Sequence, residues 1–206
     1  MSNTLVYSFL LWIFFGFQHS FLARPYFKSI IEKLFGNIFV QHFYPIIYFI
    51  SQCIIFLLIY DLIRNLGPNV IFFTIPEYLE IFIYIFNKIA HLFLILTVFH
   101  FDIGKFTGFT QFLAFFFKKK ENKILVETLN KSYFYKYIRH PMYLGIILVY
   151  LSSTTIYTDI FFVNAFCILA YIEIGTYFEE KTLLMRFSSE YEQYQTLTKK
   201  YIPFIR

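Results

Sequence analysis

The stretch "PMYLGIILVYLSSTTIYTDIFFVNAFCILAYIEIGTYF", Pro141–Phe178, decides the fold because it holds two apolar runs with almost nothing between them. The first run, Pro141–Ile156, is short for a membrane span, whereas the second, Ile160–Phe178, has the length of a membrane helix. Only "YTD" separates the two runs, so the sequence predicts a tight helical hairpin. Pro141 suits the first turn of the first helix, where its missing N–H costs no hydrogen bond.

Three further apolar runs precede this hairpin, and each reaches the roughly 17–25 residues that a helix needs to cross a bilayer. They are Thr4–Leu22, Phe39–Leu62 and Tyr78–Phe101. A shorter apolar segment, Phe106–Phe117, is typical of an interfacial or re-entrant piece. The sequence therefore predicts an all-α polytopic membrane protein with five transmembrane helices. We expect one domain over residues 1–206, with three spans and a cytoplasmic loop in 1–136 and the hairpin and tail in 137–206.

The composition of the 206-residue chain favours a membrane protein, with 58% hydrophobic and only 15% charged residues. A soluble domain usually carries about 25% charged residues. The net charge of +5 is typical of basic residues gathered in cytoplasmic loops, so we predict no nucleic-acid partner. Cys53 and Cys167 lie inside apolar runs without a CxxC motif or a Cys/His cluster. We therefore expect two buried, inert thiols, no disulfide and no metal site.

The positive charges also predict an orientation in the membrane. The N-terminal run has no basic n-region and no small-residue cleavage site, so we expect a retained first span instead of a signal peptide. Of the 18 Lys and Arg residues, all but Arg64 and Lys88 fall on one side of the membrane if the chain has five spans. Because Lys and Arg prefer cytoplasmic loops, we expect the N-terminus outside and the C-terminus in the cytoplasm of a bacterial inner membrane.

Ionisable side chains gather at the cytoplasmic mouth of the predicted hairpin. Arg139 and His140 open its first helix, and Glu179 and Glu180 end its second. Glu173 lies seven residues before Glu180 and therefore shares a helix face with it. Ionisable groups beside membrane spans mark functional sites by default, but a salt bridge that only closes the hairpin would use the same residues.

An amphipathic cytoplasmic helix is predicted after the acidic pair. Its apolar face has spacings of three and four residues and consists of Leu184, Phe187, Tyr191 and Tyr194. This helix would lie against the membrane face or over the charged cluster. Tyr191 and Tyr194 either pack there or help to close a lid over a bound ligand.

Three weaker polar sets occur in the N-terminal half. They are Gln18, His19, Ser20 and Arg24 in the first span; His100 and Asp102 at the end of the third; and Glu80, Tyr84, Asn87 and His91 within the third. The first two sets face the cytoplasm in the predicted topology. They either share a pocket with the C-terminal cluster or are polar residues at the membrane–water interface without a specific function. The third set, at helical spacing, predicts a polar seam that faces other helices.

The C-terminal motifs resemble those of a membrane methyltransferase family. "RHPMYLG", a short hairpin, "EEKTLLMRFSSEYEQY" and a final Pro are similar to isoprenylcysteine carboxyl methyltransferases and phospholipid methyltransferases over about Tyr137–Pro203. Ser188 stands where that family usually has Gly. "FGFQHSFLARPYFK", Phe43–Tyr44 and "FHFDIGKFTGFTQ" resemble, in a looser match, the bacterial methanethiol S-methyltransferases and their relatives in the NnrU-like branch; Thr110 stands where an Arg is usual.

The resemblance implies S-adenosylmethionine as the methyl donor. By motif, four residues would help to form the cofactor site: His140, Pro141, Tyr143 and Gly145. Arg139, Glu179 and Glu180 would fix the charged groups of the donor. The chemistry agrees, because an arginine can bind a carboxylate through two hydrogen bonds and a glutamate can hold an ammonium. Gly145 would permit the ligand to approach the backbone closely.

The resemblance also implies a small apolar thiol as acceptor, methanethiol giving dimethyl sulfide. A prenylated cysteine carboxylate or a lipid amine stays an alternative acceptor. An accessory membrane protein without catalysis stays an alternative function. A small transporter fits less well because the polar residues gather at one face of the membrane. Attack by a thiol needs the thiolate, and the proton acceptor is His19, His100 or Glu180, unless the sulfonium itself favours the thiolate. No metal is needed for methyl transfer, and the acceptor is expected to enter from the lipid bilayer.

Overall fold

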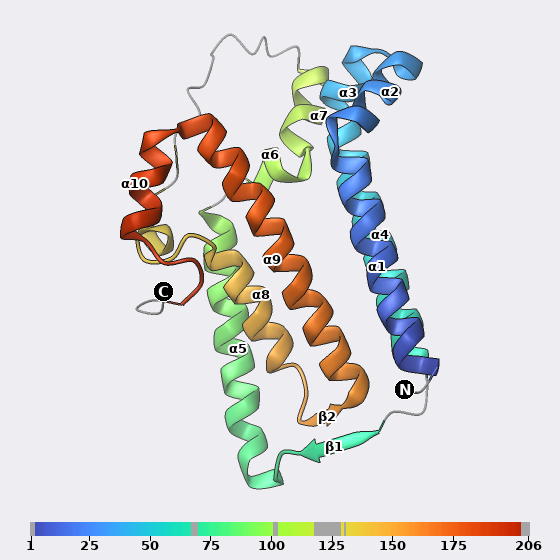
Figure 1. Ribbon diagram of the computed structural model, residues 1–206, viewed down its shortest axis with the longest axis vertical. Helices are drawn as coiled ribbons and strands as arrows, with labels where there is room; N and C mark the ends of the chain where they lie inside the picture. The colour runs from blue at the N-terminus through green and yellow to red at the C-terminus, as the bar shows by residue number, and fades with distance from the viewer. Residues whose placement is uncertain (1–2, 67–69, 101–102, 118–128, 130, 203–206) are drawn as a thin grey trace. The chain divides into compact units, whose positions relative to one another are not determined.

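The computed structural model describes residues 3–66, 70–100, 103–117, 129 and 131–202. The chain forms two compact units. The first comprises residues 1–69 and 102–125, and the second comprises residues 70–101 and 126–206 (Figure 1). The third predicted span therefore groups with the C-terminal hairpin and not with the first two spans. The single domain over 1–206 stays a prediction.

The first unit is built on two long helices that lie side by side (Figure 1). Its elements are α1 (Asn3–Ala23), α2 (Pro25–Phe35), α3 (Asn37–His42), α4 (Tyr44–Asn65), α6 (Ile103–Thr107) and α7 (Phe109–Phe116). Helices α1 and α4 are long and apolar enough to cross a membrane, which supports the first two predicted spans. Cys53 on α4 is exposed, so the prediction that both cysteines are buried is wrong for this residue and right for Cys167.

Proline and glycine explain where the shorter helices of this unit begin and end. Pro45 lies in the first turn of α4. Because Pro45 has no N–H to continue a helix from α3, the chain breaks at Phe43, and the second span begins at Tyr44 and not at the predicted Phe39. The predicted interfacial segment Phe106–Phe117 is divided into α6 and α7 at Gly108, whose φ of 81° suits glycine. Both pieces are too short to span, as predicted.

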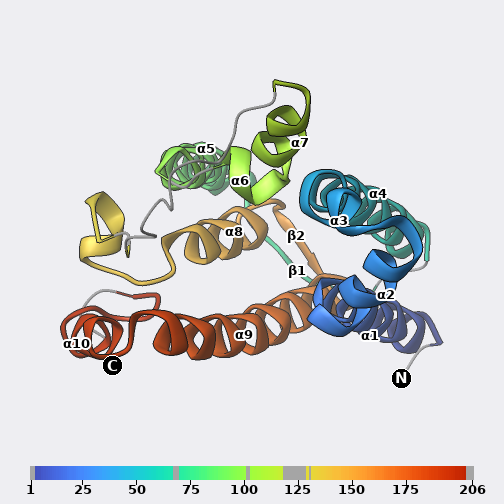
Figure 2. The ribbon, with the colours of Figure 1, turned by 90° about the horizontal axis from the view of Figure 1, so that it is seen from above.

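The second unit holds the hairpin. Its elements are β1 (Ile71–Thr74), α5 (Glu77–Phe99), the 3-10 turn η1 (Tyr133–Lys136), α8 (Pro141–Leu151), β2 (Ile156–Thr158), α9 (Asp159–Phe187) and α10 (Ser189–Leu197). Helix α8 lies between α5 and α9 (Figure 2). The strands β1 and β2 pair antiparallel, with Phe73 opposite Tyr157, and were not predicted.

The fourth predicted span differs from the structure. Helix α8 has 11 residues and, at about 1.5 Å per residue, covers only about half of a hydrocarbon core of roughly 30 Å. It ends at Leu151, since Ser152 and Ser153 turn their hydroxyls back onto helix carbonyls, and β2 follows. Within the described residues, four helices are long and apolar enough to span: α1, α4, α5 and α9. Five spans are therefore not confirmed, while an integral membrane protein is supported.

Helix α9 is much longer than the predicted span Ile160–Phe178. Its 29 residues extend about 43 Å, which exceeds a hydrocarbon core of roughly 30 Å. The helix ends at Ser188, where φ is 44°, and α10 follows in a new direction. The amphipathic stripe predicted as one helix therefore lies on two: Leu184 and Phe187 on α9, and the buried Tyr191 and Tyr194 on α10.

Candidate active site

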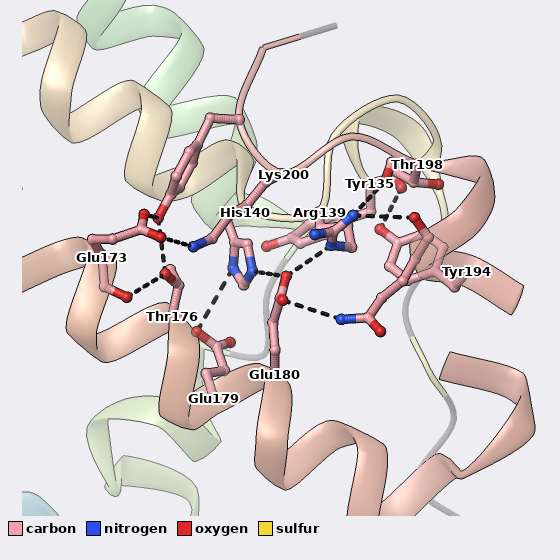
Figure 3. A network of polar contacts seen from close by, with 12 residues as sticks. Tyr135, Arg139, His140, Glu173, Thr176, Glu179, Glu180, Tyr194, Thr198 and Lys200 are labelled. Carbon is pink, nitrogen blue, oxygen red and sulfur yellow. Dashed lines mark hydrogen bonds and ion pairs between the residues drawn. The ribbon is translucent and has the colours of Figure 1, made fainter. Parts of the chain in front are cut away.

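The segment before α8 and the segment after α10 meet at the C-terminal half of α9. The "RHP" segment before α8 runs parallel to the segment after α10, with Ile138 paired to Lys199. The Arg139 N–H donates to the Lys199 carbonyl at 2.7 Å, and the His140 N–H donates to the Lys200 carbonyl at 3.1 Å. Backbone hydrogen bonds therefore fix the starts of both segments, and their side chains reach the carboxylates of α9 (Figure 3).

Local sequence explains why the chain can return to this place. Pro141 occupies the first turn of α8 and keeps His140 out of helical geometry, at φ −124° and ψ 61°. Ser188 adopts φ 44° and ψ −121°, a conformation that glycine accepts more easily than serine. The chain thus bends at Ser188, with serine in place of the usual glycine, and the bend lets α10 fold back toward "RHP".

The centre of the site is the ion pair between Arg139 and Glu180. The Arg139 Nε donates to Glu180 Oε1 at 2.7 Å, and the two side chains are only 12% and 15% exposed. The Arg139 Nη1 donates to the carbonyls of Gln195 and Thr198, at 3.3 Å and 2.5 Å. The Gln195 side chain donates to Glu180 Oε2 at 3.1 Å. The pair therefore ties α9 to the end of α10, and both oxygens of Glu180 accept hydrogen bonds.

His140 lies against both carboxylates of the acidic pair. Its Nε2 is 2.9 Å from Glu180 Oε1, and its Nδ1 is 3.7 Å from Glu179 Oε2. The imidazole is 4% exposed, whereas the Glu179 side chain is 41% exposed. Glu179 Oε2 is nonetheless a buried atom, and it has no hydrogen-bond partner among the described residues. Buried carboxylate oxygens usually have a donor, so this atom is suited to a ligand N–H.

A second ionic group lies beside the first. The Lys200 Nζ forms an ion pair with Glu173 Oε1, and the Tyr201 hydroxyl donates to Glu173 Oε2 at 3.0 Å. The Thr176 hydroxyl is 2.8 Å from the Tyr201 hydroxyl. The Tyr201 ring lies 5.9 Å from the His140 ring and 5.1 Å from the Lys200 Nζ. The Tyr201 ring therefore lies between this group and the imidazole of His140.

The phenols around the cluster stay protonated at neutral pH. Burial, followed by the carboxylate of Glu179, raises the pKa of the Tyr135 phenol to about 12. Burial also raises the pKa of Tyr191, Tyr194 and Tyr201. These side chains are therefore donors and not bases. Tyr194 donates to the Tyr135 carbonyl at 2.5 Å, whereas the Tyr191 hydroxyl, on a residue only 1% exposed, has no partner among the described residues.

The cofactor residues predicted on α8 have different surroundings. Pro141 is buried at the start of the helix. Tyr143 packs toward the cluster, with its ring 5.7 Å from that of His140. Gly145 faces helix α5 instead of open space, because a Cβ at this position would lie 3.1 Å from atoms of Leu94. Gly145 therefore permits close packing of α8 on α5, and its contact with a ligand stays a prediction.

The three predicted proton acceptors have different surroundings. Glu180 already accepts three side-chain hydrogen bonds. His100 ends α5, with its Nδ1 2.6 Å from the Leu96 carbonyl and its ring 3.9 Å from that of Tyr133. His19 belongs to the first unit, where its carbonyl accepts from the Tyr48 hydroxyl. The role of a general base stays a prediction for all three.

The weaker polar sets are used mainly in packing. Gln18 forms a reciprocal amide pair with Gln52 of α4. Asn87 faces α8, where it donates to Ser152 Oγ at 3.0 Å. The other members of the predicted seam on α5 are exposed: Glu80, Tyr84 and His91. The prediction of a seam that faces another helix therefore holds for Asn87 alone. Asp102 and the run "KKKENK" lie outside the described residues.

Four residues of the C-terminal segment reach the site although the motifs did not predict them there. They are Gln195, Thr198, Lys200 and Tyr201. Their contacts depend on the parallel pairing of Ile138 with Lys199, for which the sequence carries no spacing signal. From the sequence, the "KKY" that follows α10 indicated only a positively charged cytoplasmic tail.

Comparison with known proteins gives one informative similarity. A methanethiol S-methyltransferase from Crocosphaera subtropica is 26% identical over 198 residues, which cover 93% of this chain and 71% of that protein. No family model matches the chain, and no solved structure matches it. The similarity extends over both halves of the chain and supports, at low identity, a membrane methyltransferase of the kind that the motifs suggest.

Proposed function

We propose that this protein is an S-adenosylmethionine-dependent integral-membrane methyltransferase that methylates a small thiol. The observation that carries the proposal is the meeting of "RHP" and the acidic pair at the end of a membrane helix. Arg139, His140, Glu179 and Glu180 come from two sequence regions, and each lies within 4 Å of another member. Charged residues of both signs at the edge of an apolar layer are expected where a polar donor meets an apolar acceptor.

The residues present suit the charged end of such a donor. S-adenosylmethionine carries an ammonium, a carboxylate and a sulfonium, so its site needs both acceptors and donors. Glu179 Oε2 and the Tyr191 hydroxyl are buried polar atoms without a hydrogen-bond partner among the described residues. Glu179 is therefore the better ligand for the ammonium, since both oxygens of Glu180 are engaged within the protein.

The remaining members position these groups. Arg139 and Glu180 hold the end of α10 against α9, and His140 is held between the two glutamates. When bound, S-adenosylmethionine supplies a methyl group on a sulfonium sulfur, which an in-line nucleophile can take while the sulfonium leaves as a thioether. The chain contributes by alignment and by keeping water out, which fits a cluster in which His140 and Thr198 are each 4% exposed.

A small thiol is the acceptor that the similarity favours, because the Crocosphaera relative is named as a methanethiol S-methyltransferase. Its thiolate is the nucleophile, and methylation of methanethiol gives dimethyl sulfide. A small apolar thiol can reach the site through the bilayer. A prenylcysteine carboxylate or a lipid amine is the second candidate, because the "RHP" and "EE" motifs resemble enzymes acting on those acceptors.

The charge distribution gives the proposed setting. With the basic residues on the cytoplasmic side, the cluster faces the compartment that supplies the polar donor. The N-terminus then lies outside and the C-terminus in the cytoplasm, as in a bacterial inner-membrane protein.

The test is methyl transfer by purified protein in lipid nanodiscs, with deuterium-labelled S-adenosylmethionine and methanethiol. We expect labelled dimethyl sulfide from the wild type and a loss of about 100-fold or more in His140→Ala. His91→Ala is the matched control, because His91 is an exposed histidine of α5. Labelled product from a prenylcysteine or an aminolipid alone would move the assignment to those acceptors. No transfer to any of the three by well-folded protein would contradict the proposal.

A further inference from the structure

We infer that Lys200, and not Arg139, binds the α-carboxylate of the donor, opposite Glu179, which binds its ammonium. This inference rests on the proposed function and names the receptor for the amino-acid end of the donor. It changes the role of Arg139 from ligand binding to positioning. It also gives a function to a lysine that the motifs did not single out.

Of the five N–H groups of Arg139, those on Nε and Nη1 are used within the protein. Its Nε is bound to Glu180 and its Nη1 to two backbone carbonyls, those of Gln195 and Thr198. A two-pronged grip on a ligand carboxylate needs a pair of adjacent N–H groups. Arg139 could offer such a pair only by releasing contacts that hold α10 in place.

Lys200 has the properties that Arg139 lacks. Its ammonium has three donors, and one of them is engaged by Glu173 among the described residues. The side chain is 25% exposed, so the remaining donors can be reached. Its backbone is fixed, because the Lys200 carbonyl accepts from the His140 N–H at 3.1 Å. The cation is therefore tethered to the cluster and still has capacity for an anion.

The two receptor groups lie around the same imidazole (Figure 3). Glu179 Oε2 is 3.7 Å from His140 Nδ1, and the Lys200 Nζ lies over the Tyr201 ring, which packs near His140. In an α-amino acid the ammonium and the carboxylate are attached to one carbon. A receptor for both must therefore offer an anion and a cation around one point, and here Glu179 and Lys200 are both grouped around His140.

Binding of three ligands separates the two assignments. S-adenosylmethionine has the carboxylate and the amine, its decarboxylated form keeps only the amine, and 5′-methylthioadenosine has neither. Dissociation constants are measured by calorimetry on the full chain in lipid nanodiscs. The variants are Lys200→Ala and Glu179→Gln, with Lys199→Ala as the matched control, since Lys199 is the neighbouring lysine and contributes its backbone to the pairing.

Lys200→Ala should weaken S-adenosylmethionine binding by about 10- to 100-fold, the effect of one charge-assisted contact, and leave the decarboxylated form within about twofold. Glu179→Gln should weaken both amine-bearing ligands and leave 5′-methylthioadenosine unchanged. Lys199→Ala should change none of the three. Glu173→Gln, which removes the partner of Lys200 but keeps the cation, should retain or improve binding of the carboxylate-bearing ligand.

Two results would overturn the inference. An equal loss for all three ligands in Lys200→Ala would show that the lysine only holds the C-terminal segment in place. Unchanged affinity in that variant would exclude any contact with the carboxylate. In both cases wild-type binding of S-adenosylmethionine would leave the proposed function intact. A wild-type protein that binds none of the ligands would overturn the proposed function and this inference with it.

Discussion

The polar contacts of the two units differ in kind. In the first unit, Gln18 and Gln52 exchange amide hydrogen bonds of 2.7 Å and 3.3 Å between α1 and α4. In the second, Arg139 and Glu180 form a charged centre that is saturated, while Glu179 at its edge keeps a buried oxygen without a partner. The amide pair satisfies itself and holds two helices together. The charged cluster has capacity left at its edge, which is what a ligand site requires.

Removal of Arg139 should break the charged centre most severely. Arg139→Ala leaves the mostly buried Glu180 carboxylate without its cation and frees two carbonyls near α10. We expect a loss of about 3–5 kcal/mol in the free energy of unfolding, together with loss of donor binding. Thermal unfolding in nanodiscs measures the first effect. Arg64→Ala, at an exposed arginine of α4, is the control. Equal melting temperatures for the two variants would refute a stabilising ion pair.

The amide pair should respond differently, because both of its members can be made apolar. Gln52→Leu alone leaves the Gln18 amide unpaired between two helices and should cost about 1 kcal/mol. The double variant Gln18→Leu/Gln52→Leu should recover most of that loss and bind S-adenosylmethionine as the wild type does. Thermal unfolding and calorimetry follow the two effects. A tenfold loss of donor affinity in the double variant would show that the pair is more than a helix contact.

The smallest effect should come from the bend that brings α10 to the cluster. Ser188 has φ 44°, so Ser188→Gly should relieve strain and stabilise the protein by about 1 kcal/mol without changing donor affinity. Ser189→Gly, in the first turn of α10, should be neutral or destabilising. A lower melting temperature for Ser188→Gly would show that the serine side chain is needed at this position.

The sequence predicted the meeting of "RHP" and the acidic pair because both are covalently attached to the two arms of one hairpin. The apolar runs also located α1, α5 and the start of α9 well, since long apolar runs leave little choice of structure. The length of α8 could not be predicted in this way. Ser152 and Ser153 stop the helix, and pairing of β2 with β1 then extends the chain, which depends on residues some 85 positions away.

Individual roles at the site were harder to predict than its location. The motif suggested that Arg139 and Gly145 contact the ligand, and the structure adds that Arg139 is paired with Glu180 and that Gly145 packs on Leu94. Spacing shows which residues share a helix face, but not which hydrogen bonds they have already made. The position of Lys200 at the site could not be predicted, because it depends on a backbone pairing outside any helix.

The central claim is that the charged cluster of the second unit is the donor site. The most direct measurement is an experimental structure of the protein in nanodiscs with S-adenosylhomocysteine, which keeps the ammonium and the carboxylate of the donor. We predict ligand density beside His140, with its amino-acid end in contact with Glu179 and Lys200. Density against Gln18 and Gln52 in the first unit, with the cluster unchanged and unbound, would contradict the claim.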